Sequence, residues 1–232
     1  MPALRRLLAA SLGRVAGASA LLLAHAVVQA DTQAPWLLRH TDEATGTQVF
    51  LRDAADGVPE FRAVTHMHAR LSALAAALLD TRLMPDWVYR TRSVVNIDLV
   101  SATEGYTQVI VAMPWPFDDR EAIVHWHLAQ DPTSGTVTMR GTSAPDKLPA
   151  DPAYVRMPAF ESSWMFTPLP GGDVEVVFRG RGDPGGNLAS PLLRSFVGSA
   201  AWKAPLHTVV RLRDVVARPE IASAVFAFIR EP

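Results

Sequence analysis

Alternating apolar and polar positions dominate the chain between residues 48 and 181 and predict an antiparallel sheet. The segments are rich in β-branched and aromatic residues, and turn sequences such as Asp56-Gly57 and Pro170-Gly171-Gly172 separate them. Short turns between successive strands favour antiparallel pairing. The predicted strands are 48–52, 60–67, 88–100, 106–113, 119–130, 136–143, 154–167 and 173–181, and Pro158 should bend the seventh.

Apolar residues at spacings of three and four predict two longer helices. Leucines between positions 71 and 79 indicate a helix over 69–79. A broad apolar stripe over 193–216 indicates a long C-terminal helix with Pro191 in its first turn, a kink at Pro205 and an end at Pro219. Short helices are expected at 36–40 and 221–229.

The alternation also assigns the two faces of the predicted strands. In the last strand Glu175, Arg179 and Arg181 share one face, so the apolar residues between them face inward. The same reasoning gives the inner-face residues of three strands as Val124, Trp126, Leu128, Phe160, Trp164, Phe166, Val174, Val176 and Phe178. Large aromatic side chains on the inner faces are compatible with a packed core and equally with the wall of a cavity.

The first thirty residues differ from the rest in charge and hydropathy. They contain three arginines and no acidic residue, positions 15–28 are almost wholly apolar, and Val28-Gln29-Ala30 is close to the pattern that signal peptidase cuts. We therefore predict a secretory signal peptide over 1–30 and one domain over 31–232, with an uncleaved membrane anchor as the alternative. An exported chain without cysteine fits a bacterial periplasm.

Composition excludes several classes of function. The chain has no cysteine, which excludes disulfides, thiol catalysis and cysteine-ligated metals. Without residues 1–30, 19 basic residues stand against 23 acidic ones, a net charge of −4, and no basic run is present. Nucleic acid is therefore not expected as a partner.

Several segments together resemble the bacterial members of the StAR-related lipid-transfer (START) domain family. The resemblance covers roughly residues 36–216 and is carried by four motifs in order: Pro114-Trp115-Pro116-Phe117-Asp118-Asp119-Arg120-Glu121, Tyr154-Val155-Arg156, Trp164-Met165-Phe166-Thr167-Pro168-Leu169 and Asp183-Pro184-Gly185-Gly186. It implies an α+β helix-grip fold, in which a curved antiparallel sheet wraps around a long C-terminal helix and encloses a hydrophobic tunnel. Residues 218–232 would be a C-terminal extension.

The resemblance also implies which residues line the tunnel. The loop 144–153 corresponds to the mobile lid of the family. The charged pair that binds sterols in animal members corresponds to positions near Thr107 and Trp126, which are uncharged here, so the resemblance does not imply a sterol ligand. The implied lining residues are Thr107, Val109, Val111, Trp126, Leu128, Trp164, Phe166, Val176, Phe178, Phe196, Val197, Ala200 and Ala204.

Three other motifs have competing interpretations. The segment 180–185 matches the glycine pattern of dinucleotide sites, but no further strand follows the helix after it, and a plain turn also explains the glycines. The His-x-His pairs at 66–68 and 125–127 could hold a metal or simply face solvent on the outside of the sheet. His207 could be a polar handle inside the tunnel or an ordinary surface histidine.

These observations predict a non-catalytic protein that binds and carries a lipid or another bulky hydrophobic molecule, without a cofactor, and with transient membrane contact. One alternative is an enzyme of the polyketide cyclase or dehydratase type acting in the same cavity. It would need an inward acid–base pair, and the alternation places Glu161, Glu175, His125 and His127 outward. A second alternative is a partner-binding module with a packed core.

Overall fold

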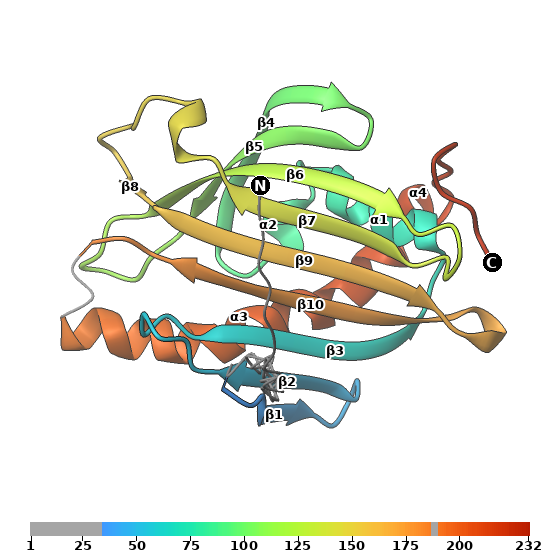
Figure 1. Cartoon of the computed structure of the whole chain (residues 1–232), viewed down its shortest axis with the longest axis horizontal. Helices are drawn as coiled ribbons and strands as arrows, with labels where there is room; N and C mark the ends of the chain where they lie inside the picture. Colours follow the sequence, from blue (N-terminus) through green and yellow to red (C-terminus); the bar gives the residue numbers. More distant parts are fainter. Residues whose placement is uncertain (1–33, 187–189) are drawn as a thin grey trace, which may run out of the picture. The chain divides into compact units, whose positions relative to one another are not determined.

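A single large sheet forms most of the molecule (Figure 1). The computed structural model describes residues 34–186 and 190–232, which form one compact unit. Nine strands pair antiparallel in the order β1-β2-β3-β10-β9-β7-β6-β5-β4, and the short β8 pairs parallel with β6. The strands are β1 (Leu37–Asp42), β2 (Thr47–Arg52), β3 (Glu60–His68), β4 (Thr91–Ser101), β5 (Glu104–Val111), β6 (Arg120–Gln130), β7 (Val137–Ser143), β8 (Val155–Arg156), β9 (Ala159–Pro168) and β10 (Asp173–Asp183).

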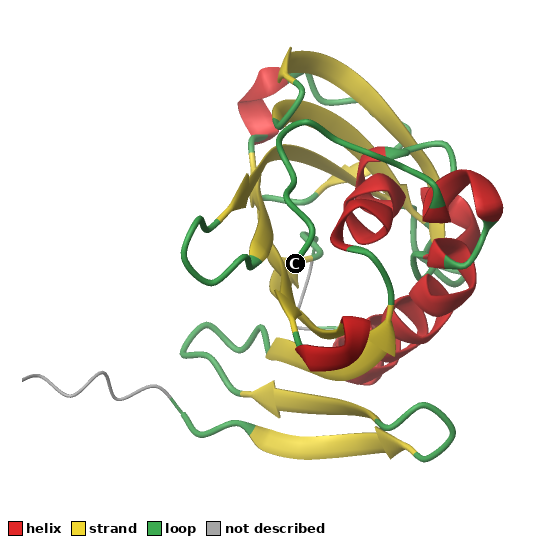
Figure 2. Ribbon diagram, turned by 90° about the vertical axis from the view of Figure 1, so that its right-hand side faces the viewer, coloured by secondary structure: helices red, strands yellow, loops and turns green. Residues whose placement is uncertain are grey.

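The helices follow the sheet in two groups. Between β3 and β4 lie α1 (Leu71–Leu79) and α2 (Met84–Trp87), and after β10 come α3 (Pro191–Val216) and α4 (Pro219–Ala222). The hydroxyl of Ser190 accepts a hydrogen bond from the Leu193 N–H at 3.5 Å, which satisfies one of the free donors of the first turn of α3. Figure 2 shows the sheet curving around the helices, so that α1 and α3 lie against its inner face.

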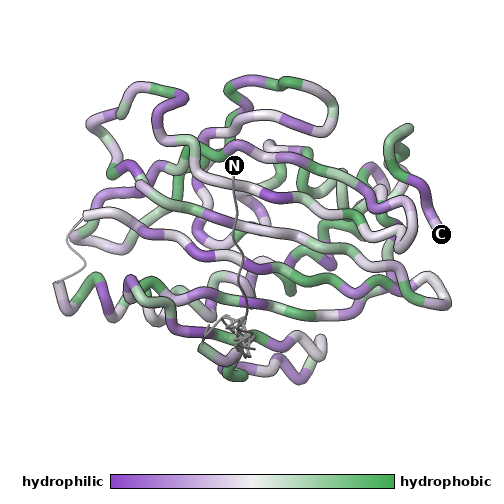
Figure 3. Tube along the Cα trace, in the orientation of Figure 1, coloured by the Kyte–Doolittle hydropathy of each residue, from purple (hydrophilic) through white to green (hydrophobic). Residues whose placement is uncertain are grey.

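The inner face of the sheet carries the apolar residues that the alternation assigns to it. Val174, Val176 and Phe166 are buried on this face, whereas Arg179 and Glu161 on the opposite face are exposed; Val177 on the opposite face is buried as well. Figure 3 shows apolar and polar residues alternating along the central strands. The predicted α+β helix-grip architecture is therefore confirmed.

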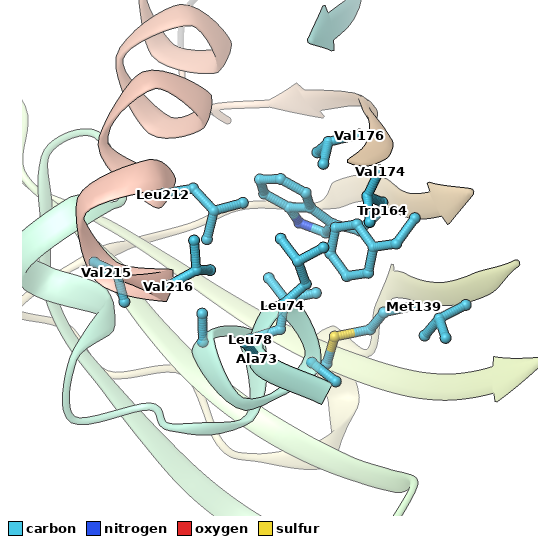
Figure 4. Packing of buried hydrophobic residues seen from close by; sticks show 14 of the residues in the cluster. Ala73, Leu74, Leu78, Met139, Trp164, Val174, Val176, Leu212, Val215 and Val216 are labelled. Carbon is cyan, nitrogen blue, oxygen red and sulfur yellow. The ribbon is translucent and has the colours of Figure 1, made fainter. Parts of the chain in front are cut away.

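Packing is dense at the end of the sheet that α1 and the second half of α3 cover. Leu74 and Leu78 from α1, and Leu212 from α3, point toward Val176 and Trp164 of the sheet (Figure 4). All of these side chains are less than a tenth exposed. Burial of apolar surface at about 25 cal/mol per Å² makes this cluster the main source of stability.

The C-terminal segment is hydrogen-bonded to the first turn of α1. The carboxylate of Glu231 accepts hydrogen bonds from the N–H groups of Leu71 and Ser72, both at 2.9 Å. A helix begins with free N–H donors, and no side chain within α1 caps them. Burial opposes ionisation of Glu231, but these bonds and the charge of Arg70 outweigh it and lower the pKa of the carboxyl. The last residues of the chain therefore act as a distant N-cap.

Several local predictions were wrong. Residues 36–40 are not helical, because Leu37–Asp42 pair with β2 as an edge strand. The expected helix over 221–229 is limited to the four residues of α4, which Pro219 begins. The strand predicted over 154–167 is divided into β8 and β9 around Pro158, which cannot donate to the sheet. α3 continues through Pro205 as one helix, as predicted, and the kink expected there stays a prediction.

The predicted signal peptide over 1–30 lies outside the described residues. Among the described residues, no helix combines the length and the apolar character needed to cross a membrane.

Candidate functional site

A first chamber of about 150 Å³ lies between the inner face of the sheet and the two early helices. Its walls come from six strands, β4 to β7, β9 and β10, together with the segment 78–88 and Thr208 of α3. Trp164 and Phe178 stack face to face there with ring centroids 4.0 Å apart, and the ring of Trp87 packs edge-on against Trp164 at 5.9 Å. Among the described residues, those that line this chamber include threonines, a serine and an asparagine but no charged side chain.

A second chamber of about 220 Å³ continues along the same strands toward the start of α3. One wall is formed by small and apolar residues of the first half of that helix, Phe196, Val197, Ala200, Ala201 and Ala204. The opposite wall is formed by β5, β6 and β10, and the segment 58–61 closes one side. Because the alanine side chains of α3 are short, the helix does not fill the space in front of the sheet.

The two chambers adjoin. Val109, Val124 and Phe160 line both of them, so the two spaces meet at these side chains. Pockets that enclose drug-sized ligands have volumes of roughly 300–1,000 Å³. Neither chamber reaches that size alone, but together they do.

Most of the tunnel residues implied by the resemblance line a chamber. Thr107, Trp126, Trp164 and Phe178 line the first. Val111, Phe196, Val197, Ala200 and Ala204 line the second, and Val109 lines both. The structure establishes where these side chains lie; that they bind a ligand remains a prediction.

Four of the predicted site residues lie elsewhere. Leu128, Phe166 and Val176 belong to the packed cluster beside the first chamber and line neither chamber. The imidazole of His207 is exposed and stacks on Tyr89 at 5.5 Å, so its position is that of a surface histidine. Periodicity gives the face of a residue but not its position along the strand, and Phe166 and Val176 lie where α1 and α3 fill the space.

The sequence did not identify several lining residues. Met84 and Trp87 lie in α2, a single turn that carries no periodic signal because it is four residues long. Asn96 comes from β4, where three register shifts disturb the alternation. Phe160, which lines both chambers, was assigned to the inner face but was not named as a tunnel residue.

The loop 144–153, expected to be a lid, is fastened to the outside of the sheet. The guanidinium of Arg156 donates to the carbonyls of Pro145, Leu148 and Pro149, and its Nε donates to the Glu121 carboxylate at 2.7 Å. Glu121 is 1% exposed and alternates with Ala122, which lines the second chamber. No residue of the loop lines either chamber, because the ion pair holds it against the opposite face of β6.

The loop between β5 and β6 lies beside the second chamber instead. Met113 lines the chamber, and two residues later Trp115 is 92% exposed. The carboxylate of Asp119 accepts a hydrogen bond from the Met113 N–H at 2.9 Å and pairs with Arg92. The Met113 bond and the charge of Arg92 lower the pKa of Asp119. The base of the loop is thus fixed while its tryptophan faces solvent.

The competing motifs have structural explanations. Gly180 lies within β10, and a Cβ there would come within 2.6 Å of the Glu161 carbonyl oxygen, so close strand packing requires the glycine. Gly185, at φ 67°, forms the turn that follows. His66 and His68 each face an acidic residue of β10 across the outer surface, and the described part of the chain contains no group of three or more side chains arranged to hold a metal ion.

The geometry can be compared with solved structures. A StAR-related lipid-transfer protein from Xanthomonas axonopodis superposes with a TM-score of 0.70 at 24% identity, over 79% of this chain and 99% of that one. Human StAR-related lipid transfer protein 5 superposes with a TM-score of 0.65 at 16% identity, over 78% of this chain and 86% of that one.

The chain has the START fold. An uncharacterized protein of Pseudomonas aeruginosa is 26% identical over 180 residues, which cover 77% of this chain and 85% of the relative. No family model matches the sequence. The resemblance found in the sequence is confirmed at the level of the fold, whereas the identity of a ligand has to be argued from the site.

Proposed function

We propose that this START-fold protein binds one bulky apolar molecule in the two adjoining chambers and carries it through water. The observation that supports the proposal is the first chamber, whose described lining has no charged side chain although it lies at the centre of the fold. Moving apolar ligand surface from water into such a chamber gains roughly 25 cal/mol per Å². The described lining offers no group with a pKa near neutrality for general acid–base catalysis, because threonine, serine and asparagine side chains do not ionise in that range.

We also propose a brief contact with membranes through the β5–β6 loop. A tryptophan that is 92% exposed leaves a large apolar surface in water. Leu192, in the first turn of α3, is another exposed apolar side chain, at 57%. Tryptophan is favoured at the level of lipid head groups, where its ring is buried and its N–H remains hydrated. Docking there would bring the second chamber close to the bilayer.

Export to the periplasm is a further part of the proposal, supported by the composition of residues 1–30 alone. N-terminal sequencing of the protein from a bacterial periplasmic extract should give a chain that begins at Asp31. A chain that keeps Met1 in the membrane fraction would instead support the uncleaved anchor.

A transfer assay tests the carrier proposal. Donor vesicles that contain a self-quenched fluorescent fatty acid are mixed with acceptor vesicles, and dequenching is followed with and without the protein. We expect the transfer rate to rise in proportion to protein concentration. A rate equal to the spontaneous one, together with no probe bound to the isolated protein, would refute carriage and binding at once.

A further inference from the structure

Arg120, the first residue of β6, lies buried at the wall of the second chamber, and no carboxylate among the described residues forms an ion pair with it. Its side chain is among those that line the chamber, and the residue is 4% exposed. Its Nε donates to the Pro184 carbonyl oxygen at 2.7 Å, and its Nη1 donates to the carbonyl oxygen of Asp118. These two bonds to neutral carbonyl oxygens hold the side chain but supply no ion pair for its charge.

The nearby acids attract the guanidinium of Arg120 without forming an ion pair with it. The charges of Asp118 and Asp119 raise the pKa of Arg120, but burial outweighs them. Asp118 is exposed and accepts a hydrogen bond from Arg120 through its backbone carbonyl. Asp119 directs its carboxylate to Arg92 and to the N–H of Met113. Within the described residues, Nη2 of Arg120 has no hydrogen-bond partner, and it lies 3.6 Å from the position that a Cβ at Gly186 would take. Burial lowers the pKa of Arg120, as expected for a cation removed from water.

A buried charge is costly unless an opposite charge or further hydrogen bonds compensate it. The other arginine of this chamber, Arg181, has such a partner in Asp56. Arg120 differs because the groups around it in the chamber are apolar, including Val111, Ala122 and Phe196. A guanidinium with free N–H donors binds carboxylate and phosphate oxygens well. Arg120 therefore places a positive charge at the wall of a chamber whose other lining residues are mainly apolar.

We infer that the ligand is an amphiphile with one tail and an anionic head group, and that Arg120 binds this head group. The inference rests on the proposed function and specifies its substrate class. A cavity of roughly 150 Å³ holds a benzene molecule, so the two chambers together hold on the order of fifteen carbon atoms. That is the length of a single fatty-acid chain. The tail would extend from Arg120 past Val109 and Val124 into the uncharged first chamber.

Myristic acid and myristyl alcohol test this, because they share a tail and differ in the head group. Both are titrated calorimetrically into delipidated wild-type protein at pH 8. We expect the acid to bind at least about tenfold more tightly, since a hydrogen bond to a charged group contributes more than a neutral one. If neither ligand binds, the proposed function fails. If both bind with equal affinity, the carrier stands and the role of Arg120 is refuted.

Variants then assign the preference to one residue. Arg120→Met should reduce the acid-to-alcohol ratio to near one, and Arg120→Lys should keep part of it. Arg52→Gln is the matched control, because Arg52 is paired with Glu60 and lines neither chamber, so the ratio should stay unchanged. A ratio that falls equally in Arg52→Gln would show a general effect of positive charge instead of a head-group site. If Arg120→Met does not fold, the acid-to-alcohol ratios of the wild type and of Arg120→Lys still decide whether Arg120 binds the head group.

Discussion

The substitution Ala200→Trp should block ligand uptake while leaving the fold intact. Ala200 lies on α3 and lines the second chamber, which has a volume of about 220 Å³. An indole at this position would point from the helix into that space. Because the space is already open, the overpacking cost of about 1–3 kcal/mol that a filled core imposes should be largely avoided.

The effect on binding follows from the volume. By comparison with the roughly 150 Å³ cavity that holds benzene, the second chamber holds on the order of eight carbon atoms. Excluding that many methylenes, at about 0.8 kcal/mol each, removes about 6 kcal/mol of transfer free energy. Even if half of the tail finds another position, the remaining loss corresponds to at least about a hundredfold weaker binding.

The assay is titration of a fluorescent fatty acid into delipidated protein, with thermal unfolding measured in parallel. Ser195→Trp is the matched control, since Ser195 is exposed on the same helix and lines neither chamber. We expect the control to bind like the wild type and Ala200→Trp to melt within a few degrees of it. Wild-type affinity in a folded Ala200→Trp protein would refute a ligand site in the second chamber.

Three further predictions concern the surface, the loop and the terminus. Trp115→Ala should slow transfer between vesicles several-fold with a stability change within about 0.5 kcal/mol; unchanged transfer would exclude docking through this loop. Glu121→Gln should lower the unfolding free energy by about 3 kcal/mol, because it leaves Arg156 without its partner. Ligand release should not accelerate in this variant. Faster release would show that the loop 144–153 acts as a lid. Glu231→Gln should cost about 1 kcal/mol at pH 7, as lost helix caps do. The lowered pKa of Glu231 means that this contribution exists above the unfolded value of about 4.3 and is lost as the pH falls below it, so chemical denaturation of the two proteins should converge in acid and stay apart at pH 7.

The sheet could be predicted because its strands obey a simple period. The large apolar residues Trp164, Phe166, Val174, Val176 and Phe178 recur at every second position of β9 and β10, and the tight turns between strands are marked by glycine and proline. The elements at the margins could not be predicted in this way. Residues 37–42 form a strand only because β2 offers a free edge, a tertiary effect that local propensity does not contain.

The sequence predicts on which face of the sheet the site residues lie, but not at which positions along the strands the open space lies. Trp164 and Phe166 are two residues apart on one strand face, yet the first borders open space and the second is fully enclosed by packing. The difference depends on where α1 and the second half of α3 fill the sheet and where the alanines of the first half leave it open. Arg120 was part of a recognised motif, but its burial beside the chamber depends on the Pro184 carbonyl, 64 residues further along the chain.

Native mass spectrometry of the protein purified from its native source tests the central claim most directly. The chambers between the sheet and α3 should hold one guest, so we predict a complex with a single bound molecule, and extraction should yield an amphiphile with one tail and an anionic head. A spectrum that shows only the bare polypeptide, unchanged after incubation with fatty acid, would contradict the account.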